Sequence, residues 1–197
     1  GLGGNLDGDN FKPALDLIAE DAKDLYLLEL SSFQLETTQN LGAAVATILN
    51  LSTDHMDRYE GIADYHRAKQ KIFTGCKQVV INRDDKESFP LNNSDAAVWD
   101  FGFGRAGVNG LGLLEEDGDL YLAYQLEKIV SVNQLKVFGQ HNILNVLAAV
   151  ALAMAIDIDI DMNAIKAAIT EFSGLPHRCQ WVANIDGVDF YNDSKGT

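Results

Sequence analysis

A glutamate and a histidine occupy positions in this sequence from which they could share a metal ion. Glu29 lies near the end of the apolar run Leu25–Leu30, and His55 lies in the polar segment Asn50–Arg58, directly after the apolar run Ala43–Leu49. In open parallel sheets, ligands bind at the carboxyl ends of the strands. If the two runs are neighbouring strands, the carboxylate and the imidazole converge there. With water and phosphate oxygens, they would suit a divalent cation.

Spacing alone leaves a structural alternative for both residues. A glutamate at a strand end is more often solvated or caps a helix, and His55 can be hydrogen-bonded to Asp54 or Asp57 within a polar loop. On spacing alone, this structural alternative is the stronger of the two.

The elements that would carry these residues form a βαβ pattern. The runs Leu25–Leu30, Ala43–Leu49 and Gln78–Ile81 are continuous rather than alternating, which is typical of strands buried on both faces of a parallel sheet. The helical pattern of Ile62–Phe73 separates the last two runs. This order predicts right-handed βαβ units and an α/β fold, with a mostly parallel sheet flanked by helices.

The middle of the chain predicts a small antiparallel β patch laid on this sheet. Leu113–Tyr124 has two apolar arms around Asp117-Gly118, a hairpin turn signal, and Val98–Phe103 and Ile129–Val137 are further candidate strands.

The C-terminal third predicts two helices and a second hairpin. His141–Ile156 is apolar on most of its surface, as expected of a buried helix, and Asn163–Phe172 is the second helical segment. Gln180–Ile185 and Val188–Tyr191 flank the turn signal Asp186-Gly187.

Length and composition fit one globular domain over residues 1–197. Hydrophobic residues make up 47% of the chain and charged residues 22%, which is enough apolar material for a core. The net charge of −14 argues against nucleic acid as a partner, because a phosphate backbone is held by clustered Lys and Arg. It does not exclude a small phosphate ligand held by backbone amides and a bound cation.

The sequence carries no sign of membrane insertion or secretion. No apolar run approaches the length of a membrane span, and the N-terminus lacks the pattern of a signal peptide. Cys76 and Cys179 are far apart, which predicts two ordinary thiols in a reducing cytoplasm. The chain opens on a glycine-rich loop and stops directly after a predicted strand, so we expect a domain excised from a longer protein.

Five segments of the chain resemble the Mur ligase family and occur in the order found in that family. Their residues are those of its D-glutamate-adding branch. The segments are LELSSFQLE at 28–36, NLSTDHMDRY at 50–59, GQHNILN at 139–145, GLPHR at 174–178 and YNDSKGT at 191–197. They extend through almost the whole chain, so chance agreement is excluded as an explanation.

The resemblance implies the central, P-loop NTPase-like domain of an ATP-dependent ligase. Such an enzyme phosphorylates the alanyl carboxylate of UDP-N-acetylmuramoyl-L-alanine and joins it to D-glutamate in peptidoglycan biosynthesis. The resemblance also implies a cytoplasmic, monomeric enzyme that uses Mg²⁺. The family's N-terminal UDP-binding domain, its phosphate loop and its C-terminal domain have no counterpart in this chain, so we expect the fragment to be inactive alone.

The resemblance assigns three residues to the metal site. Glu29 and His55 match the family's magnesium ligands, and Lys69 matches the lysine that these ligases carry as a carbamate. Taken without the resemblance, Lys69 would belong to an exposed basic helix face.

Further residues match substrate and nucleotide contacts of the family. The positions that contact the UDP-sugar correspond to Asn5, Ser31 and Gln34. The adenine and ribose contacts correspond to Asn142, Asn145, Arg178 and Asp193. The loop that approaches the phosphates contains Lys195 and Thr197.

Structural alternatives apply to several of these residues. Asn142 and Ser31 can cap the helices that follow them, Arg178 can be a surface residue, and Asp193 can form a turn. The structural interpretation is preferred for the residues that the resemblance does not use, which are His66, His141, His177, Cys76 and Cys179.

Two departures keep other functions open. Gly3–Leu15 is longer and more acidic than its counterpart in the D-glutamate-adding ligases. The string GLGGNLDGDN at 1–10 also resembles a glycine-rich loop of folylpolyglutamate synthases. The sequence also contains no GxxxxGK[ST] phosphate loop. The alternatives are another ligase of the Mur or folylpolyglutamate type and a non-catalytic nucleotide-binding module.

Overall fold

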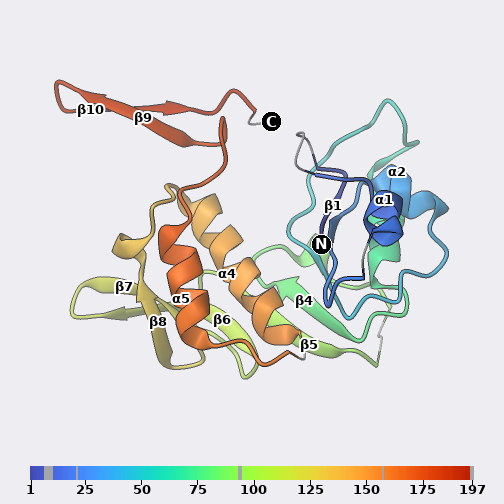
Figure 1. Cartoon of the computed structure of the whole chain (residues 1–197), viewed down its shortest axis with the longest axis horizontal. Coiled ribbons are helices and arrows are strands. Elements are labelled where there is room, and N and C mark those ends of the chain that lie inside the picture. Colours follow the sequence, from blue (N-terminus) through green and yellow to red (C-terminus); the bar gives the residue numbers. More distant parts are fainter. Residues whose placement is uncertain (7–10, 21, 93–94, 157, 196–197) are drawn as a thin grey trace.

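A six-stranded sheet forms the centre of the computed structural model, which describes residues 1–6, 11–20, 22–92, 95–156 and 158–195 (Figure 1). Its strands, in spatial order, are β3 (Val45–Ile48), β4 (Gln78–Asn82), β5 (Ala97–Phe101), β6 (Gly110–Glu116), β7 (Asp119–Tyr124) and β8 (Glu127–Ser131). Strands β3 to β6 pair in parallel, and β6 to β8 pair antiparallel.

The parallel half confirms the prediction of strands buried on both faces for the runs Ala43–Leu49 and Gln78–Ile81. The prediction is wrong for Leu25–Leu30, which lies outside this sheet, with Leu25 and Leu27 41% and 56% exposed. Consecutive residues of β4 enter two different cores: Val79 packs with Phe73 and Cys76, while Val80 packs with Leu147 of the opposite layer. Both valines are at most 1% exposed. Because side chains alternate across a strand, a strand covered by helices on both faces needs an unbroken apolar run.

The predicted antiparallel strands are confirmed, but they extend the same sheet instead of lying on it, which corrects their predicted placement. β6 starts in parallel beside the end of β5, with Asp100 opposite Gly110, and then runs on to pair with β7. A side chain at Gly110 would collide with the Asp100 carboxylate, so glycine permits this close approach. The predicted turn is confirmed, with φ 55° at Asp117 and 83° at Gly118, as in a type I′ hairpin.

Helices cover both faces of the sheet. α4 (Gln140–Ala155) lies across β3 to β6, and α5 (Met162–Glu171) lies beside it (Figure 1). On the other face, α3 (Ile62–Gln70) continues into the 3-10 helix η1 (Lys71–Phe73), which packs on β3. Two further 3-10 turns are η2 (Lys86–Ser88) and η3 (Val132–Gln134). Of the helices described, none combines the length and apolarity that a bilayer crossing requires.

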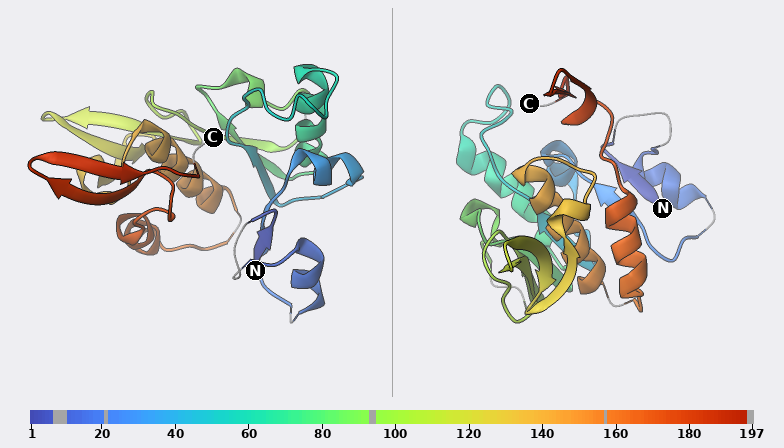
Figure 2. Two further views of the ribbon diagram at one scale, coloured as in Figure 1. Left: turned by 90° about the horizontal axis from the view of Figure 1, so that it is seen from above. Right: turned by 90° about the vertical axis from the view of Figure 1, so that its left-hand side faces the viewer.

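A small N-terminal unit carries Glu29 and is separate from the main sheet. β1 (Leu2–Gly4) and β2 (Leu27–Glu29) form a parallel two-stranded sheet, with α1 (Ala14–Ala19) between them in sequence and α2 (Ser32–Thr37) after them. Figures 1 and 2 show this blue unit at the opposite end of the molecule from β7 and β8.

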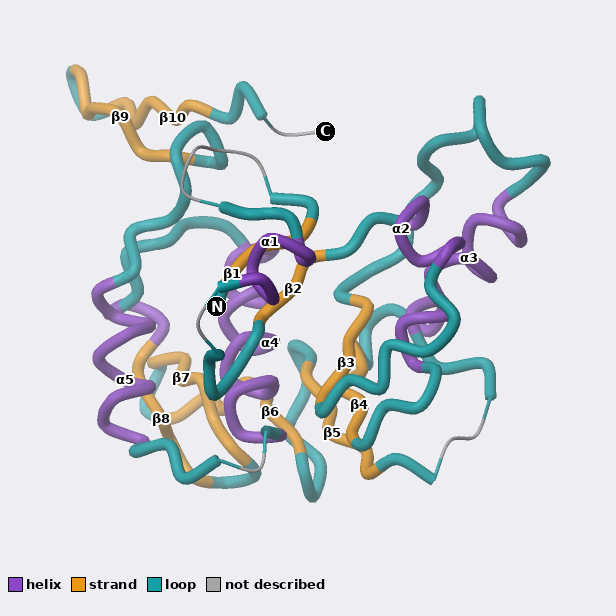
Figure 3. The backbone as a smooth tube through the Cα atoms, turned by 45° about the vertical axis from the view of Figure 1, so that its right-hand side comes forward, coloured by secondary structure: helices purple, strands orange, loops and turns teal. Residues whose placement is uncertain are grey.

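The condition that the strands before Glu29 and His55 are neighbours in one sheet is therefore wrong for the described residues. β2 pairs only with β1, and β3 pairs only with β4 (Figure 3). The two short strands make their hydrogen bonds to different partners, so backbone pairing does not set the spacing between Glu29 and His55.

The second predicted hairpin is confirmed and projects from the body (Figure 1). It consists of β9 (Gln180–Ile185) and β10 (Val188–Asn192), joined at Asp186 and Gly187, with φ of 51° and 82°. Its large apolar side chains are between 42% and 57% exposed, and they are Trp181, Val182, Ile185, Val188, Phe190 and Tyr191.

Candidate functional site

Glu29 and Asn5 meet at the carboxyl ends of β1 and β2. The Asn5 amide donates to the Glu29 carbonyl over 2.8 Å. Gly4, which precedes Asn5, has φ 102°, and a side chain there would collide with the Glu29 backbone. This glycine therefore permits the close approach that brings the two residues together. The Glu29 side chain itself is exposed.

Helix α2 begins three residues after the end of β2, and its first turn forms a capping box. The Gln34 amide donates to Ser31 Oγ over 3.3 Å, and the Ser31 amide donates to Gln34 Oε1 over 2.9 Å. The capping role considered for Ser31 is thus confirmed, and Gln34 shares it. Their contacts with a UDP-sugar stay predictions.

His55 lies in an exposed loop and is surrounded by aromatic rings. Its φ is 54°, its side chain is 43% exposed, and Nε2 lies 3.7 Å from the Asp54 carboxylate. The imidazole centroid is 5.0 Å from that of Phe33 on α2 and 6.3 Å from that of Tyr65 on α3. Side chains of both helices thus reach the loop that carries His55.

Two polar side chains, one on the last residue of β4 and one just after it, hold the start of this loop. Asn82 Nδ2 donates to the Leu49 carbonyl over 2.8 Å, and Asp85 Oδ2 accepts from the Leu51 amide over 2.6 Å. Asn82 is 4% exposed, and its Oδ1 also accepts from the Asp84 amide over 3.0 Å. The end of β4 therefore fixes where the chain leaves β3 on its way to His55.

Replacing Asn82 by alanine should lower the free energy of unfolding by about 1–3 kcal/mol, because it removes two part-buried hydrogen bonds, to the Leu49 carbonyl and from the Asp84 amide. Urea denaturation followed by circular dichroism measures this change. Asn133→Ala is the matched control, since Asn133 is exposed and makes only a 3.4 Å side-chain bond to Asp119. An equal urea midpoint for the two variants would contradict the stabilising role proposed for Asn82.

Lys69 lies on α3, partly buried, with Nζ 6.0 Å from the centre of the Tyr65 ring. Tyr65 is buried, with 7% of its surface exposed, and its ring contacts both His55 and Lys69. Burial raises the pKa of the Tyr65 hydroxyl, and the charge of Asp54 raises it further. The ring is thus neutral where it faces the ammonium group, and it attracts that group as a cation–π partner.

The described residues contain no group of three His, Cys, Asp or Glu side chains placed to hold a metal. Glu29 and His55 therefore offer one carboxylate and one imidazole, both reachable from solvent. Mg²⁺ is usually held by one or two carboxylates while keeping several waters and substrate phosphate oxygens. Two protein ligands of this kind suit Mg²⁺ that is bound together with a nucleotide. They do not suit a metal ion that is enclosed entirely by protein ligands.

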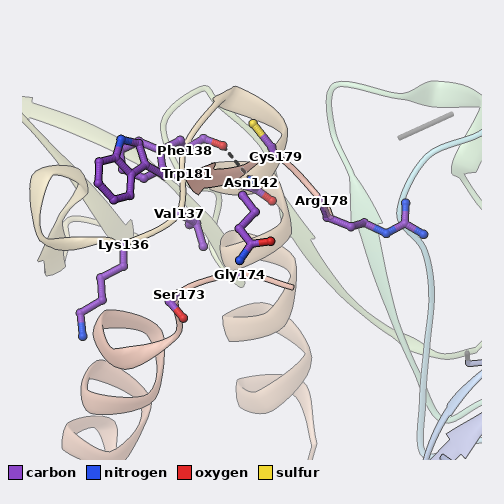
Figure 4. A pocket seen from close by; sticks show the side chains of 10 residues that line it. Lys136, Val137, Phe138, Asn142, Ser173, Gly174, Arg178, Cys179 and Trp181 are labelled. Atoms are coloured by element: carbon purple, nitrogen blue, oxygen red, sulfur yellow. Dashed lines mark hydrogen bonds between the residues drawn. The ribbon is translucent and has the colours of Figure 1, made fainter. Parts of the chain in front are cut away.

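A cavity of about 250 Å³ lies near the start of α4, at the base of the C-terminal hairpin (Figure 4). Asn142 and Arg178 line it, together with Phe138 and Trp181, which the sequence did not indicate. A larger, more apolar cavity of about 460 Å³ adjoins it between α4 and α5, and Asn145 joins Asn142 and Arg178 in its wall. Three of the predicted nucleotide-binding residues therefore line the larger of these two cavities.

Asn142 does not cap α4, which corrects that alternative. The N-cap is Gly139, whose φ is 90°, and no side chain bonds to the cap. Asn142 Nδ2 donates instead to the Phe138 carbonyl over 2.7 Å, and Asn145 Nδ2 lies 3.5 Å from Asn142 Oδ1. The two amides form a short polar row along the cavity wall.

The segment after β10 folds back toward Arg178. Asp193 Oδ1 accepts from the Cys179 amide over 2.8 Å, and the Lys195 amide donates to the His177 carbonyl over 3.0 Å. Asp193 thus comes beside the residue that follows Arg178, whose guanidinium points away from Asn142 in Figure 4. The predicted phosphate contact Thr197 lies outside the described residues.

Comparison with known proteins finds one family across most of the chain. Residues 10–153 match the sequence model of the Mur ligase middle domain. The chain is 53% identical over 196 residues to UDP-N-acetylmuramoylalanine–D-glutamate ligase of Pseudomonas savastanoi, and 52% and 45% identical to the ligases of that name from Pseudomonas aeruginosa and Marinobacter nauticus. Each match covers 100% of this chain and 42% of the relative.

Solved structures agree on the fold. A UDP-N-acetylmuramoyl-L-alanyl-D-glutamate–2,6-diaminopimelate ligase superposes with a TM-score of 0.61 at 24% identity, covering 82% of this chain and 35% of that one. MurF from Acinetobacter baumannii superposes with a TM-score of 0.61 at 18% identity, covering 85% of this chain and 38% of that one. At these identities the likeness supports the α/β architecture alone.

Proposed function

The chain belongs to the Mur ligase family, and from that premise we propose that it is the middle part of an ATP-dependent ligase that joins D-glutamate to UDP-N-acetylmuramoyl-L-alanine. The observation that carries the proposal is that 53% identity to a D-glutamate ligase extends over 100% of the chain, which is 42% of that relative. The enzyme would act as a single copy in the cytoplasm, where ATP is available, and would serve peptidoglycan biosynthesis.

The reaction must overcome the poor reactivity of a carboxylate. A carboxylate oxygen of the alanyl group attacks the terminal phosphorus of ATP, and the bond to the ADP oxygen breaks, giving an acyl phosphate. The amine of D-glutamate then attacks the acyl carbon, loses a proton, and phosphate leaves as the amide forms. Two anions must be held together for the first step, and water must be kept from the acyl phosphate until the second.

Glu29 and His55 are the residues that would hold Mg²⁺ in this reaction. Their side chains are exposed, and the rings of Phe33 and Tyr65 lie against the imidazole. The bound ion supplies positive charge that offsets the charge of the phosphate oxygens. Glu29 contributes the hard carboxylate oxygen that such a cation prefers.

Lys69 would act as a carbamate, as the family resemblance implies. A protonated ammonium repels a cation, whereas the carbamate formed from the neutral amine and carbon dioxide offers two acceptor oxygens. In the structure Lys69 Nζ lies 6.0 Å from the centre of the Tyr65 ring.

The cavity beside α4 supports a base and ribose site. Adenine is flat and carries donors and acceptors on its edge, which suits the aromatic walls Phe138 and Trp181 and the amide of Asn142. In the same proposal, further ribose and phosphate contacts come from Asn145, Arg178, Asp193, Lys195 and Thr197. The UDP-sugar contacts come from Asn5, Ser31 and Gln34.

The isolated chain is expected to fold but to bind ATP poorly and to form no amide bond, because its 197 residues contain no GxxxxGK[ST] phosphate loop. Calorimetry should give it an ATP affinity at least about tenfold, or ~1.4 kcal/mol, weaker than that of the full-length protein. Adenosine should bind it nearly as well as ATP, since the contacts reach mainly base and ribose. ATP affinity equal to that of the full-length protein would show that the domain boundary is misplaced.

A substrate panel on the full-length protein tests the proposed activity directly. ADP release should require both UDP-N-acetylmuramoyl-L-alanine and D-glutamate, and L-glutamate should not replace the D-isomer. Turnover with a reduced folate and L-glutamate would instead identify a folyl-type ligase. Nucleotide binding without turnover on any acceptor would identify a non-catalytic module.

A further inference from the structure

A ring contact that the proposed reaction does not use joins helix α2 to His55. The centroids of Phe33 and His55 are 5.0 Å apart, with the ring planes inclined by 52°. Phe33 lies four residues after Glu29, at the second position of α2. One short segment therefore carries a proposed metal carboxylate and a ring that packs on the proposed metal imidazole.

Phe33 is itself held in place from the His55 loop. Tyr59 stacks on it with an interplanar angle of 5° and a centroid distance of 6.2 Å, and the Arg58 guanidinium lies 5.9 Å from its centroid. Arg58 also pairs with Glu36, one turn further along α2, at 2.9 Å. Stacked rings and a guanidinium over a ring are each favourable contacts, so the position of Phe33 is well defined.

His55 has no comparable polar support. Within the described part of the chain its ring nitrogens make no hydrogen bond, and Nε2 has only a 3.7 Å contact with the Asp54 carboxylate. Metal-binding imidazoles are usually oriented by a hydrogen bond from the second ring nitrogen. Here aromatic contacts with Phe33 and Tyr65 are what set the orientation of the ring.

We infer that Phe33 is a positioning residue that orients the His55 imidazole toward the metal site shared with Glu29. β2 and β3 do not pair with each other, so strand pairing does not fix the position of His55 relative to Glu29. The packing of Phe33 on His55 fixes it instead. The inference rests on the proposed role of His55 as a magnesium ligand. Phe33 acts through His55 and touches no reacting atom.

The first test reads the His55 ring by NMR in the full-length protein labelled with ¹³C at histidine Cε1. The His55 signal is identified by its loss in His55→Gln. Phe33→Leu and Phe33→Met should both move it, because the ring current of Phe33 is removed, while Phe33→Tyr should leave it near the wild-type position. Phe190→Leu is the matched control, since Phe190 is 49% exposed and Phe33 40%. The other histidine signals show whether each variant is folded.

The second test measures the magnesium concentration that gives half-maximal turnover. It should rise roughly tenfold in Phe33→Leu, as is typical when a residue that orients a metal ligand is lost, and should recover in Phe33→Tyr. KM for D-glutamate should stay unchanged. An unmoved His55 signal in both Phe33→Leu and Phe33→Met, or an unchanged magnesium requirement, would overturn the inference. Failure of the proposed ligase activity is seen separately, because the NMR measurement needs no turnover.

Discussion

Replacing Glu29 by alanine or glutamine in the full-length enzyme is expected to reduce turnover by at least about 100-fold at limiting magnesium, and His55→Ala is expected to do the same. Each change removes one of the two proposed magnesium ligands, and the described residues contain no group of three His, Cys, Asp or Glu side chains that could take over the metal. Glu29→Gln is the sharper variant, because it keeps the size of the side chain and removes only its charge. Raising magnesium should restore part of the lost rate.

The measurement is a magnesium titration of ADP release. Glu60→Ala serves as the control, because Glu60 is an exposed carboxylate close to His55 in sequence. Near-normal rates for Glu29→Ala and His55→Ala at limiting magnesium would remove both residues from the metal site. A loss that magnesium cannot reduce at all would point to a role in substrate positioning instead.

Lys69→Ala should also lose roughly 10–100-fold in turnover, and a short carboxylate such as acetate should restore part of it. The small acid enters the space left by the side chain and supplies the oxygen acceptors that the carbamate would supply. Neither an exposed basic lysine nor a simple packing residue predicts rescue by an anion.

Arg67→Ala is the matched control for this experiment. Arg67 lies on the same helix, is exposed, and pairs with Asp64 at 2.6 Å. Its loss should change turnover little, because exposed ion pairs contribute at most about 1 kcal/mol to stability, and acetate should have no effect. Full activity of Lys69→Ala without any added acid would identify Lys69 as a surface lysine.

Local sequence patterns were sufficient for the elements whose signals are local. Continuous apolar runs predicted β3 and β4, the Asp-Gly pairs predicted both hairpins, and the long apolar segment predicted α4, which spans Gln140–Ala155. β1 and α1 were missed because they are only 3 and 6 residues long, too short for a periodic signal. The continuation of the sheet from β5 into β6 depends on a contact between Asp100 and Gly110 that periodicity does not contain.

Some residues of the candidate sites could likewise be identified from the sequence, and others could not. Glu29 and His55 stand in segments that resemble the family, and Lys69 matches a position of the family, so these three residues were available from the sequence. The contacts of Phe33 with His55, of Asn82 with Leu49 and of Trp181 with the cavity near α4 were not, because they join distant segments. Such contacts follow from tertiary packing, and nothing in the residue types alone indicates them.

The projecting C-terminal hairpin has a consequence for the fate of the polypeptide in a cell. Its cross-strand pairs Tyr191–Trp181 and Val188–Ile185 leave large side chains exposed on a two-stranded sheet, and no other strand of the described residues pairs with its edges. Unpaired strand edges and exposed apolar surface promote aggregation. We therefore expect a form of the protein in which this hairpin stays uncovered to aggregate more readily than one in which the hairpin is covered.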